Sequence, residues 1–299
     1  MSDRAILGIF REKSHSPMRE YDDEAILKET AAALSERIGR QIPLLSPQEF
    51  LDAGLDFKPE LIFYMCEEES CLKKLRDIRE SMGCTLVNTV EAVENTFRAR
   101  MLDILSHEEF FPSSKIISSG ETVSQCPEGG VWLKRGDFHA IESEDVIFVD
   151  SPDKFNDALS RFAKRGIKDV VVQHHIEGDI IKFYSITNFQ KGKEYWFKWF
   201  YHKEQDLKGY KFSETQLLHR CQKAGSLLGL EIFGGDAIVQ PDGNIFVIDV
   251  NAWPSFALFR KEAARGISNL LGDKLDEMAG SVHTEVSGQQ SRPLNIIPS

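Results

Sequence analysis

Apolar and polar positions follow two patterns over the first third of the chain. Residues 5–10 and 60–65 are short continuous apolar runs, which are typical of buried strands. Apolar residues recur at helical spacing over 24–38 and 71–82. The order strand, helix, strand, helix predicts a small parallel α/β lobe. Loops that follow the strands of such a lobe face a cleft, so they are candidate binding segments.

Beyond this lobe a helical pattern over 89–105 ends before Pro112, and short strands then dominate. Helical spacing returns at 154–165 and 215–228. The polar segment 281–299 is predicted to be a frayed tail. The predicted strands are 115–118, 131–134, 146–149, 170–176, 180–188, 195–201 and a hairpin over 235–251.

The composition is that of a folded, acidic protein. The 299 residues include 36 Lys and Arg against 47 Asp and Glu, and 41% are hydrophobic, which rules out wholesale disorder. The formal charge of -11 argues against binding to nucleic acid or to an anionic membrane. No segment has the roughly 20 apolar residues that span a bilayer, and the five cysteines lack metal-site spacing. We expect a cytoplasmic monomer or homodimer that binds a small anionic substrate.

The strongest chemical signal is the hairpin around Asp242-Gly243, a dipeptide that favours tight turns. A two-residue loop there places Asp236 directly opposite Asp249. Two facing carboxylates repel unless a cation lies between them. Asn251 follows Asp249 by two positions and points to the same face. Three hard oxygen ligands on one face suit Mg2+; the alternative is a solvent-facing polar stripe.

Two further segments carry groups that could hold a nucleotide. Lys134 ends a predicted strand before the short loop 135–139, so it can reach phosphates as a point charge. The alternative is an exposed Lys-Arg pair at a turn. The strand that ends near Gln173 runs into the polar turn 177–179, where backbone amides and a carboxylate could meet a base and a ribose. His174 and the next histidine point to opposite faces of that strand, which argues against a shared metal.

Together these elements resemble the ATP-grasp superfamily over residues 5–275: an α/β lobe, a strand-end lysine, a Gln-x-x-Ile-x-Gly-Asp hinge, then Asp and Asp-x-Asn. The resemblance implies an α/β fold in which ATP lies between two antiparallel sheets. It divides the chain into an N-terminal lobe (1–88), a linker helix with the first subdomain (89–176), a second subdomain with the Mg2+ site (177–280) and a flexible tail (281–299). It implies ATP contacts for Arg98, Lys134, His139, Gln173, His174, Ile176, Asp179 and Lys182, with Asp179 at the ribose.

Most ATP-grasp proteins are carboxylate-amine ligases, but two segments are more similar to the inositol phosphate kinases of the superfamily. The run Asp249-Val-Asn-Ala-Trp-Pro-Ser-Phe256 resembles the Asp-Val-Asn-Gly-Phe/Trp-Ser-Phe segment of the diphosphoinositol pentakisphosphate kinases, where Ser-Phe lies against substrate. The loop 13–20 resembles their Lys-Ser-x-Ser-Lys-Pro-Met-Lys-Glu loop, which supplies cations to the inositol phosphate. The loop is one residue shorter than theirs, and Pro254 is extra.

We therefore predict an ATP- and Mg2+-dependent kinase, of the diphosphoinositol pentakisphosphate or inositol tris-tetrakisphosphate kinase type, that acts on a small inositol-phosphate-like anion. The predicted metal ligands are Asp236, Asp249 and Asn251. The predicted catalytic residues are Lys134, Lys182 and Asp249. The predicted acceptor-binding residues are Lys13, His15, Arg19, Lys198 and Ser255. The alternative is a carboxylate-amine ligase that forms an amide through an acyl phosphate, and a third interpretation is a nucleotide-binding module without catalysis.

Overall fold

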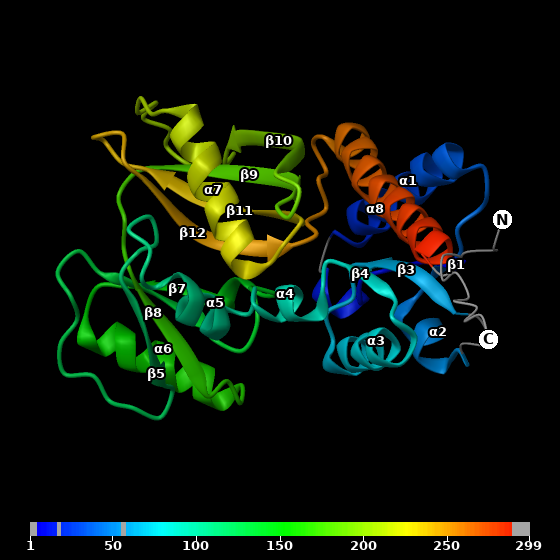
Figure 1. Cartoon of the computed structure of the whole chain (residues 1–299). Helices are drawn as coiled ribbons and strands as arrows, with labels where there is room; N and C mark the ends of the chain where they lie inside the picture. Colours follow the sequence, from blue (N-terminus) through cyan, green and yellow to red (C-terminus); the bar gives the residue numbers. More distant parts are fainter. Residues whose placement is uncertain (1–4, 17–18, 55–57, 289–299) are drawn as a thin grey trace, which may run out of the picture.

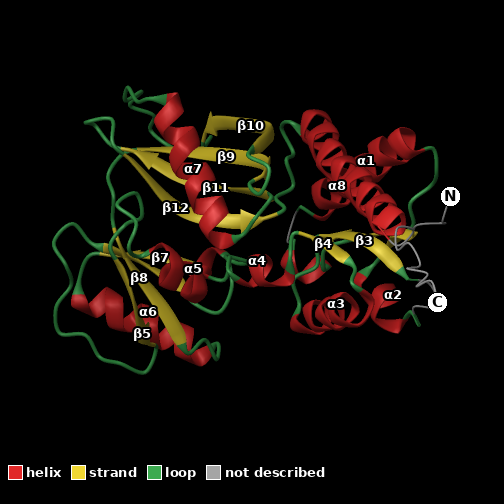
Figure 2. Ribbon diagram, viewed as in Figure 1, coloured by secondary structure: helices red, strands yellow, loops and turns green. Residues whose placement is uncertain are grey.

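The computed structural model describes residues 5–16, 19–54 and 58–288, which form three four-stranded sheets and the helices that cover them (Figures 1 and 2). One sheet is parallel and two are antiparallel, so the predicted α/β class is confirmed. None of the helices in these residues is both long and apolar enough to cross a membrane.

The parallel sheet forms the N-terminal lobe, with the strand order β2-β1-β3-β4. Its strands are β1 Ala5–Ile9, β2 Leu44–Leu45, β3 Pro59–Tyr64 and β4 Thr85–Val87. Ile6 and Leu61 pack in one cluster with α1 (Glu20–Ile38) and α8 (Arg260–Gly288). Leu7 and Ile62 point the other way, toward α2 (Pro47–Asp52) and α3 (Glu69–Met82). Both faces are covered, as is usual for parallel sheets, and the C-terminal helix completes the first lobe.

The two antiparallel sheets lie beside this lobe (Figure 1). The second sheet has the order β5-β8-β6-β7 and packs against α6 (Pro152–Lys164). The third has the order β10-β9-β11-β12 and packs against α7 (Glu214–Leu228). The strands of these sheets are β5 Ser114–Ser118, β6 Val131–Arg135, β7 Val146–Val149, β8 Asp169–His174, β9 Asp179–Asn188, β10 Lys193–Tyr201, β11 Ile232–Val239 and β12 Ile245–Ala252.

Three predicted elements differ from the structure. The helix predicted over 89–105 is two helices, α4 (Val90–Glu94) and α5 (Arg98–Leu105). The first turn of a helix needs external acceptors, and here Ala99 N–H donates to Gly136 O at 2.9 Å, which docks α5 against the end of β6. The strand predicted over 170–176 ends at His174. Helix α8 runs to Gly288, inside the predicted tail, and residues 289–299 lie outside the described residues.

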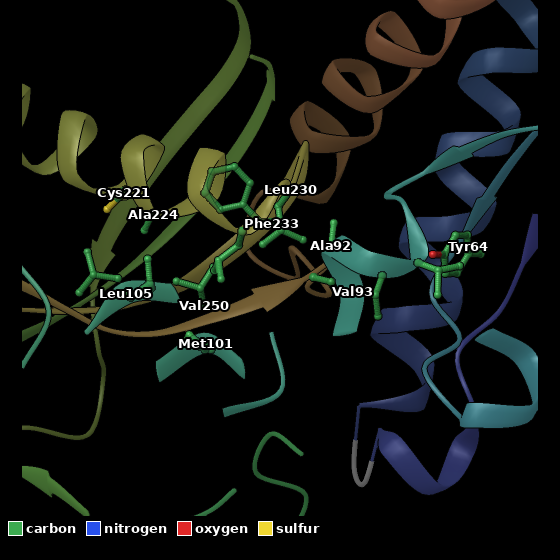
Figure 3. Packing of buried hydrophobic residues seen from close by; sticks show 14 of the residues in the cluster. Tyr64, Ala92, Val93, Met101, Leu105, Cys221, Ala224, Leu230, Phe233 and Val250 are labelled. Atoms are coloured by element: carbon green, nitrogen blue, oxygen red, sulfur yellow. The ribbon is translucent and has the colours of Figure 1, made fainter. Parts of the chain in front are cut away.

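One buried cluster joins the N-terminal lobe to the third sheet (Figure 3). Phe233 of β11 is fully buried in it, and burial of such a side chain contributes about 1.5–3 kcal/mol. The cluster reaches Tyr64 of β3 through Ala92 and Val93 of α4. The loops at the ends of β1 and β12 are therefore held by one shared core. The other residues labelled in Figure 3 are Met101, Leu105, Cys221, Ala224, Leu230 and Val250.

Gly225 of α7 tests how tightly this core is packed. A Cβ at Gly225 would lie 2.2 Å from Cζ of the buried Phe233, so we expect Gly225→Ala to lower the free energy of unfolding by about 1–3 kcal/mol. Gly272→Ala in α8 is the control, because its Cβ meets the partly exposed guanidinium of Arg37, which is paired with Asp273 and Asp276, and we expect the free energy of unfolding to change by less than about 1 kcal/mol. Urea denaturation measures both, and equal stability of the two variants would contradict this packing.

Candidate active site

The β11–β12 hairpin places Asp236 opposite Asp249, as predicted, but by a different route. The turn is three residues long, 241–243, rather than two, and Gly243 has a φ of 84°, a left-handed conformation that suits glycine. A bulge at Ile248 then shifts the register back by one residue. The register shift from the longer turn is cancelled by the shift from the bulge, so Asp236 still pairs with Asp249.

Polar side chains share one face of the third sheet around this pair. Lys182 of β9 is the neighbour of Asp236 on its other side, and Nζ of Lys182 donates to Oδ1 of Asp236 at 2.7 Å. Asn251 lies two residues beyond Asp249 and faces the same way. All four side chains belong to half-buried residues. The sheet therefore offers two carboxylates and one amide oxygen on one face, a donor set that suits Mg2+.

Two buried cations approach the acids from the second sheet and α5. Nζ of Lys134 donates to O of Ile248, the bulge residue, at 3.0 Å, and Nη2 of Arg98 lies 3.4 Å from Oδ2 of Asp249. Within the described part of the chain, Nε and Nη1 of Arg98 are buried without a hydrogen-bond partner. Burial lowers the pKa of Lys134 to about 8, against the opposing effect of Asp249. Buried donors without acceptors are costly, so these residues fit an anionic ligand such as the Mg2+-bound phosphates of ATP.

A cavity of about 370 Å³ separates this face of the third sheet from the N-terminal lobe. It is bounded by the loop after β1, the loop after β6 and the segment that follows β12. Predicted residues of the acceptor, nucleotide and metal groups therefore meet in one place. The predicted site residues in its lining are His15, Arg19, His139, Lys182, Asp249, Asn251 and Ser255.

Two predicted acceptor residues lie outside this cavity. Lys13 lines a neighbouring cavity of about 510 Å³ next to the same loop. Lys198 of β10 is exposed, and its Nζ lies 5.2 Å from the centroid of the Phe259 ring. The predicted cluster of cations around an anionic acceptor is therefore smaller in the structure than the sequence suggested.

The connection from β8 to β9 carries the residues predicted to bind the adenosine. Gln173 is buried at the end of β8, His174 is exposed and Ile176 is half-buried. Trp132 Nε1–H donates to Nδ1 of His175, the residue after the end of β8, at 3.1 Å.

Asp179 does not have the surroundings that the predicted ribose contact requires. Its side chain is buried, and its two oxygens accept from the backbone N–H groups of Lys208 and Tyr210 at 2.7 and 2.9 Å. Both oxygens are thus engaged in holding the segment after β10. An Asp in a hinge motif looks the same in sequence whether it faces a ligand or a loop.

Arg11, which the sequence analysis did not single out, connects the two walls of the cavity. Its Nη2 donates to O of Trp253 at 2.7 Å and to O of Ala252 at 3.4 Å. Its Nη1 lies 3.0 Å from Oε1 of Glu67, and its Nε lies 3.3 Å from Oδ2 of Asp23. The one signal in the sequence is its place at the end of the first predicted strand, just before the loop 13–20 that is predicted to bind the acceptor.

Two histidine–glutamate pairs lie next to Arg11. Nδ1 of His139 lies 3.4 Å from Oε2 of Glu67, and Nδ1 of His15 lies 3.6 Å from Oε2 of Glu12. Burial lowers the pKa of both histidines, that of His139 well below its usual range. Burial also raises the pKa of Glu67 to about 7. His15 was predicted to act as a cation, but its lowered pKa makes its ring neutral near pH 7.

No family model and no curated protein matches this sequence. Solved structures do match over nearly the whole chain. The D-alanine–D-alanine ligase from Bacillus anthracis complexed with ATP has a TM-score of 0.66 and 17% identity and covers 94% of this chain and 99% of its own. The D-alanine–D-alanine ligase from Coxiella burnetii has a TM-score of 0.62 and 12% identity and covers 95% and 100%.

A third match is the ATP-grasp ligase PsnB complexed with a minimal precursor, with a TM-score of 0.56, 15% identity and coverage of 90% and 98%. The chain therefore has the ATP-grasp fold, as the sequence resemblance implied. At these identities the likeness concerns the fold alone. All three proteins are ligases, and none of them is an inositol phosphate kinase.

Lys134 should make nucleotide affinity depend on pH. Its amine is protonated below a pKa of about 8 and neutral above it, so its attraction to phosphate is present at pH 7 and fades as the pH rises. We expect the Kd of a non-hydrolysable ATP analogue with Mg2+ to rise by about tenfold between pH 7 and 9.5. Lys134→Met should bind more weakly at pH 7, with a flatter profile.

Isothermal titration calorimetry at several pH values measures this effect. Lys261→Met is the control, because Lys261 is exposed at the start of α8 and lines neither cavity. It should keep the wild-type profile. A Lys134→Met variant with the wild-type pH slope would show that another group titrates.

Proposed function

We propose that this protein is an ATP- and Mg2+-dependent carboxylate–amine ligase. The observation that carries the proposal is that Asp236, Asp249 and Asn251 lie between buried cations and a cavity of small positive charge. The ligase identity of the proteins that share the fold supports this function over the predicted kinase. The motif at 249–256 still favours the kinase, which is the second candidate.

The charge of the cavity supports a single carboxylate as the acceptor. Its described lining contains three cations, Arg11, Arg19 and Lys182, against two carboxylates. Arg11 and Lys182 are already paired with acidic side chains. Its two histidines have lowered pKa values and are neutral near pH 7. An acceptor with several phosphates needs more cations than this lining offers.

The neighbouring cavity of about 510 Å³ has the opposite charge and supports an amine as the second substrate. It shares Arg11, Ser16 and Asp23 with the first cavity, so the two are adjacent. An ammonium group is attracted to a lining in which acids outnumber bases. The acids that line it are Glu12, Glu20, Asp23, Glu24, Glu49 and Glu68, against Arg11 and Lys13.

The chain supplies position and charge for the first half-reaction. Asp236, Asp249 and Asn251 would hold Mg2+, which neutralises charge on the β- and γ-phosphates when bound. Lys134 and Lys182 offset charge on the transferred group. An oxygen of the substrate carboxylate attacks the γ-phosphorus as the bond to ADP breaks, which leaves an acyl phosphate. An amine then attacks the acyl carbon and phosphate leaves.

Hydroxylamine tests this function because it converts an acyl phosphate to a stable hydroxamate. The protein is incubated with ATP, Mg2+, hydroxylamine and a panel of amino acids and small carboxylic acids. We expect ATP-dependent hydroxamate with at least one acid. Asp249→Asn should lower the rate at least about 100-fold, because metal-bound charge is worth several kcal/mol in the transition state.

Asp242→Asn is the matched control, since Asp242 is an exposed acid on the turn of the same hairpin. It should keep the wild-type rate, and circular dichroism checks that both variants fold. Phosphate transfer to inositol phosphates without any hydroxamate would instead establish the kinase. ATP binding with neither product would point to a module without catalysis.

A further inference from the structure

Glu67 and His139 form a contact at the cavity that phosphoryl transfer leaves unused. Glu67 is buried just after β3, and its Oε1 lies 3.0 Å from Nη1 of Arg11. Its Oε2 is buried without a hydrogen-bond partner among the described residues and lies 3.4 Å from Nδ1 of His139. A carboxylate beside one ring nitrogen of a histidine sets the orientation of the ring and leaves the other nitrogen for a ligand.

His139 is held against the cavity from more than one side. It lies on the loop after β6, and the cavity that it lines also contains Lys182 and Asp249. Its ring centroid is 4.1 Å from that of Phe138, which in turn lies 4.8 Å from the ring of Phe97. Because Nδ1 is turned toward Glu67, Nε2 is the nitrogen available to a group in the cavity.

We infer that His139 is the base that removes a proton from the ammonium group of the amine co-substrate, and that Glu67 is the positioning residue for its ring. The inference rests on the proposed ligase function and specifies the co-substrate as an amine that is protonated in solution. One N–H bond of the ammonium breaks and its proton passes to Nε2. The freed lone pair attacks the acyl carbon, the C–O bond to phosphate breaks, and the second proton leaves on the phosphate.

The surroundings of His139 keep the ring neutral, so that the lone pair of Nε2 is free near pH 7. Burial is the main cause of its lowered pKa, and the neighbouring cations act in the same direction. The carboxylate form of Glu67, whose pKa is raised to about 7 by burial, lies beside Nδ1 and would stabilise the imidazolium once it forms. The groups that face His139 are Arg11 after β1, His15 in η1 (Lys13–His15), Glu67 after β3, Arg98 in α5 and Arg135 in β6.

Two nucleophiles of similar size, hydroxylamine and ammonium, distinguish loss of the proposed base from a general loss of activity at the site. Hydroxylamine is largely unprotonated at pH 7, whereas ammonium must lose a proton before it attacks. Wild-type protein with ATP, Mg2+ and the acid found in the hydroxamate screen should form both hydroxamate and, from ammonium chloride, the primary amide. His139→Asn should keep most of its hydroxamate rate but lose at least about 100-fold in amide formation at pH 7. The lost rate should return as the pH rises and free ammonia accumulates.

Glu67→Gln should lower amide formation by about tenfold and shift its pH profile, while the hydroxamate rate stays near wild type. His219→Asn on the exposed side of α7 is the control and should change neither rate. A hydroxamate rate that falls with the amide rate in His139→Asn would overturn the inference and favour the predicted ATP contact. The inference would also be overturned if His139→Asn left amide formation unaffected, or if His15→Asn selectively abolished it. It would likewise be overturned if the wild type made hydroxamate but no amide. Wild type that makes no hydroxamate would refute the ligase function instead.

Discussion

Two carboxylates that face each other, Asp236 and Asp249, determine how the surrounding elements are arranged. Like charges about 4 Å apart repel by about 4 kcal/mol near a protein surface. Lys182 from β9, Arg98 from α5 and Lys134 from β6 offset this repulsion from three directions. The hydrogen bond from Nζ of Lys134 to O of Ile248 joins the second sheet to the third beside these acids.

Arg11 connects the N-terminal lobe to the strand that carries Asp249. It binds the carbonyls of Ala252 and Trp253, which directly follow the metal-ligand candidate Asn251. The same guanidinium pairs with Glu67, the carboxylate beside His139. The positions of the metal face and of the proposed base thus depend on one buried cation, whose two carboxylate partners keep its pKa raised despite burial. A change in the contact between the lobes would move both together.

The sequence predicted most strands, the α/β class and the facing acids, because these follow from local periodicity. It missed features set by distant contacts. The bulge at Ile248 forms where Lys134 reaches across from another sheet, and Arg11 binds carbonyls 241 and 242 residues away. Asp179 was assigned to a ribose because spacing does not reveal that backbone amides already occupy it. The register of the hairpin was right although the predicted turn was one residue too short, since the bulge restored it.

The arrangement of charge around the cavity explains why a weak base such as His139 would be sufficient for the proposed proton transfer. In water an amine holds its proton far more tightly than imidazole does, with reference pKa values of about 7.7–8.0 for an α-amine or 10.4 for lysine against 6.5 for histidine. The cations that lower the pKa of His139 also act on an ammonium bound beside Lys182 and Arg19. An amine that enters through the neighbouring cavity would therefore be attracted by its acidic side chains while it is charged. It would lose its proton more easily near the acyl group, where cations line the cavity. A hydroxyl acceptor carries no positive charge. The change from an acidic to a basic lining would therefore assist an amine acceptor in a ligase but not a hydroxyl acceptor in a kinase.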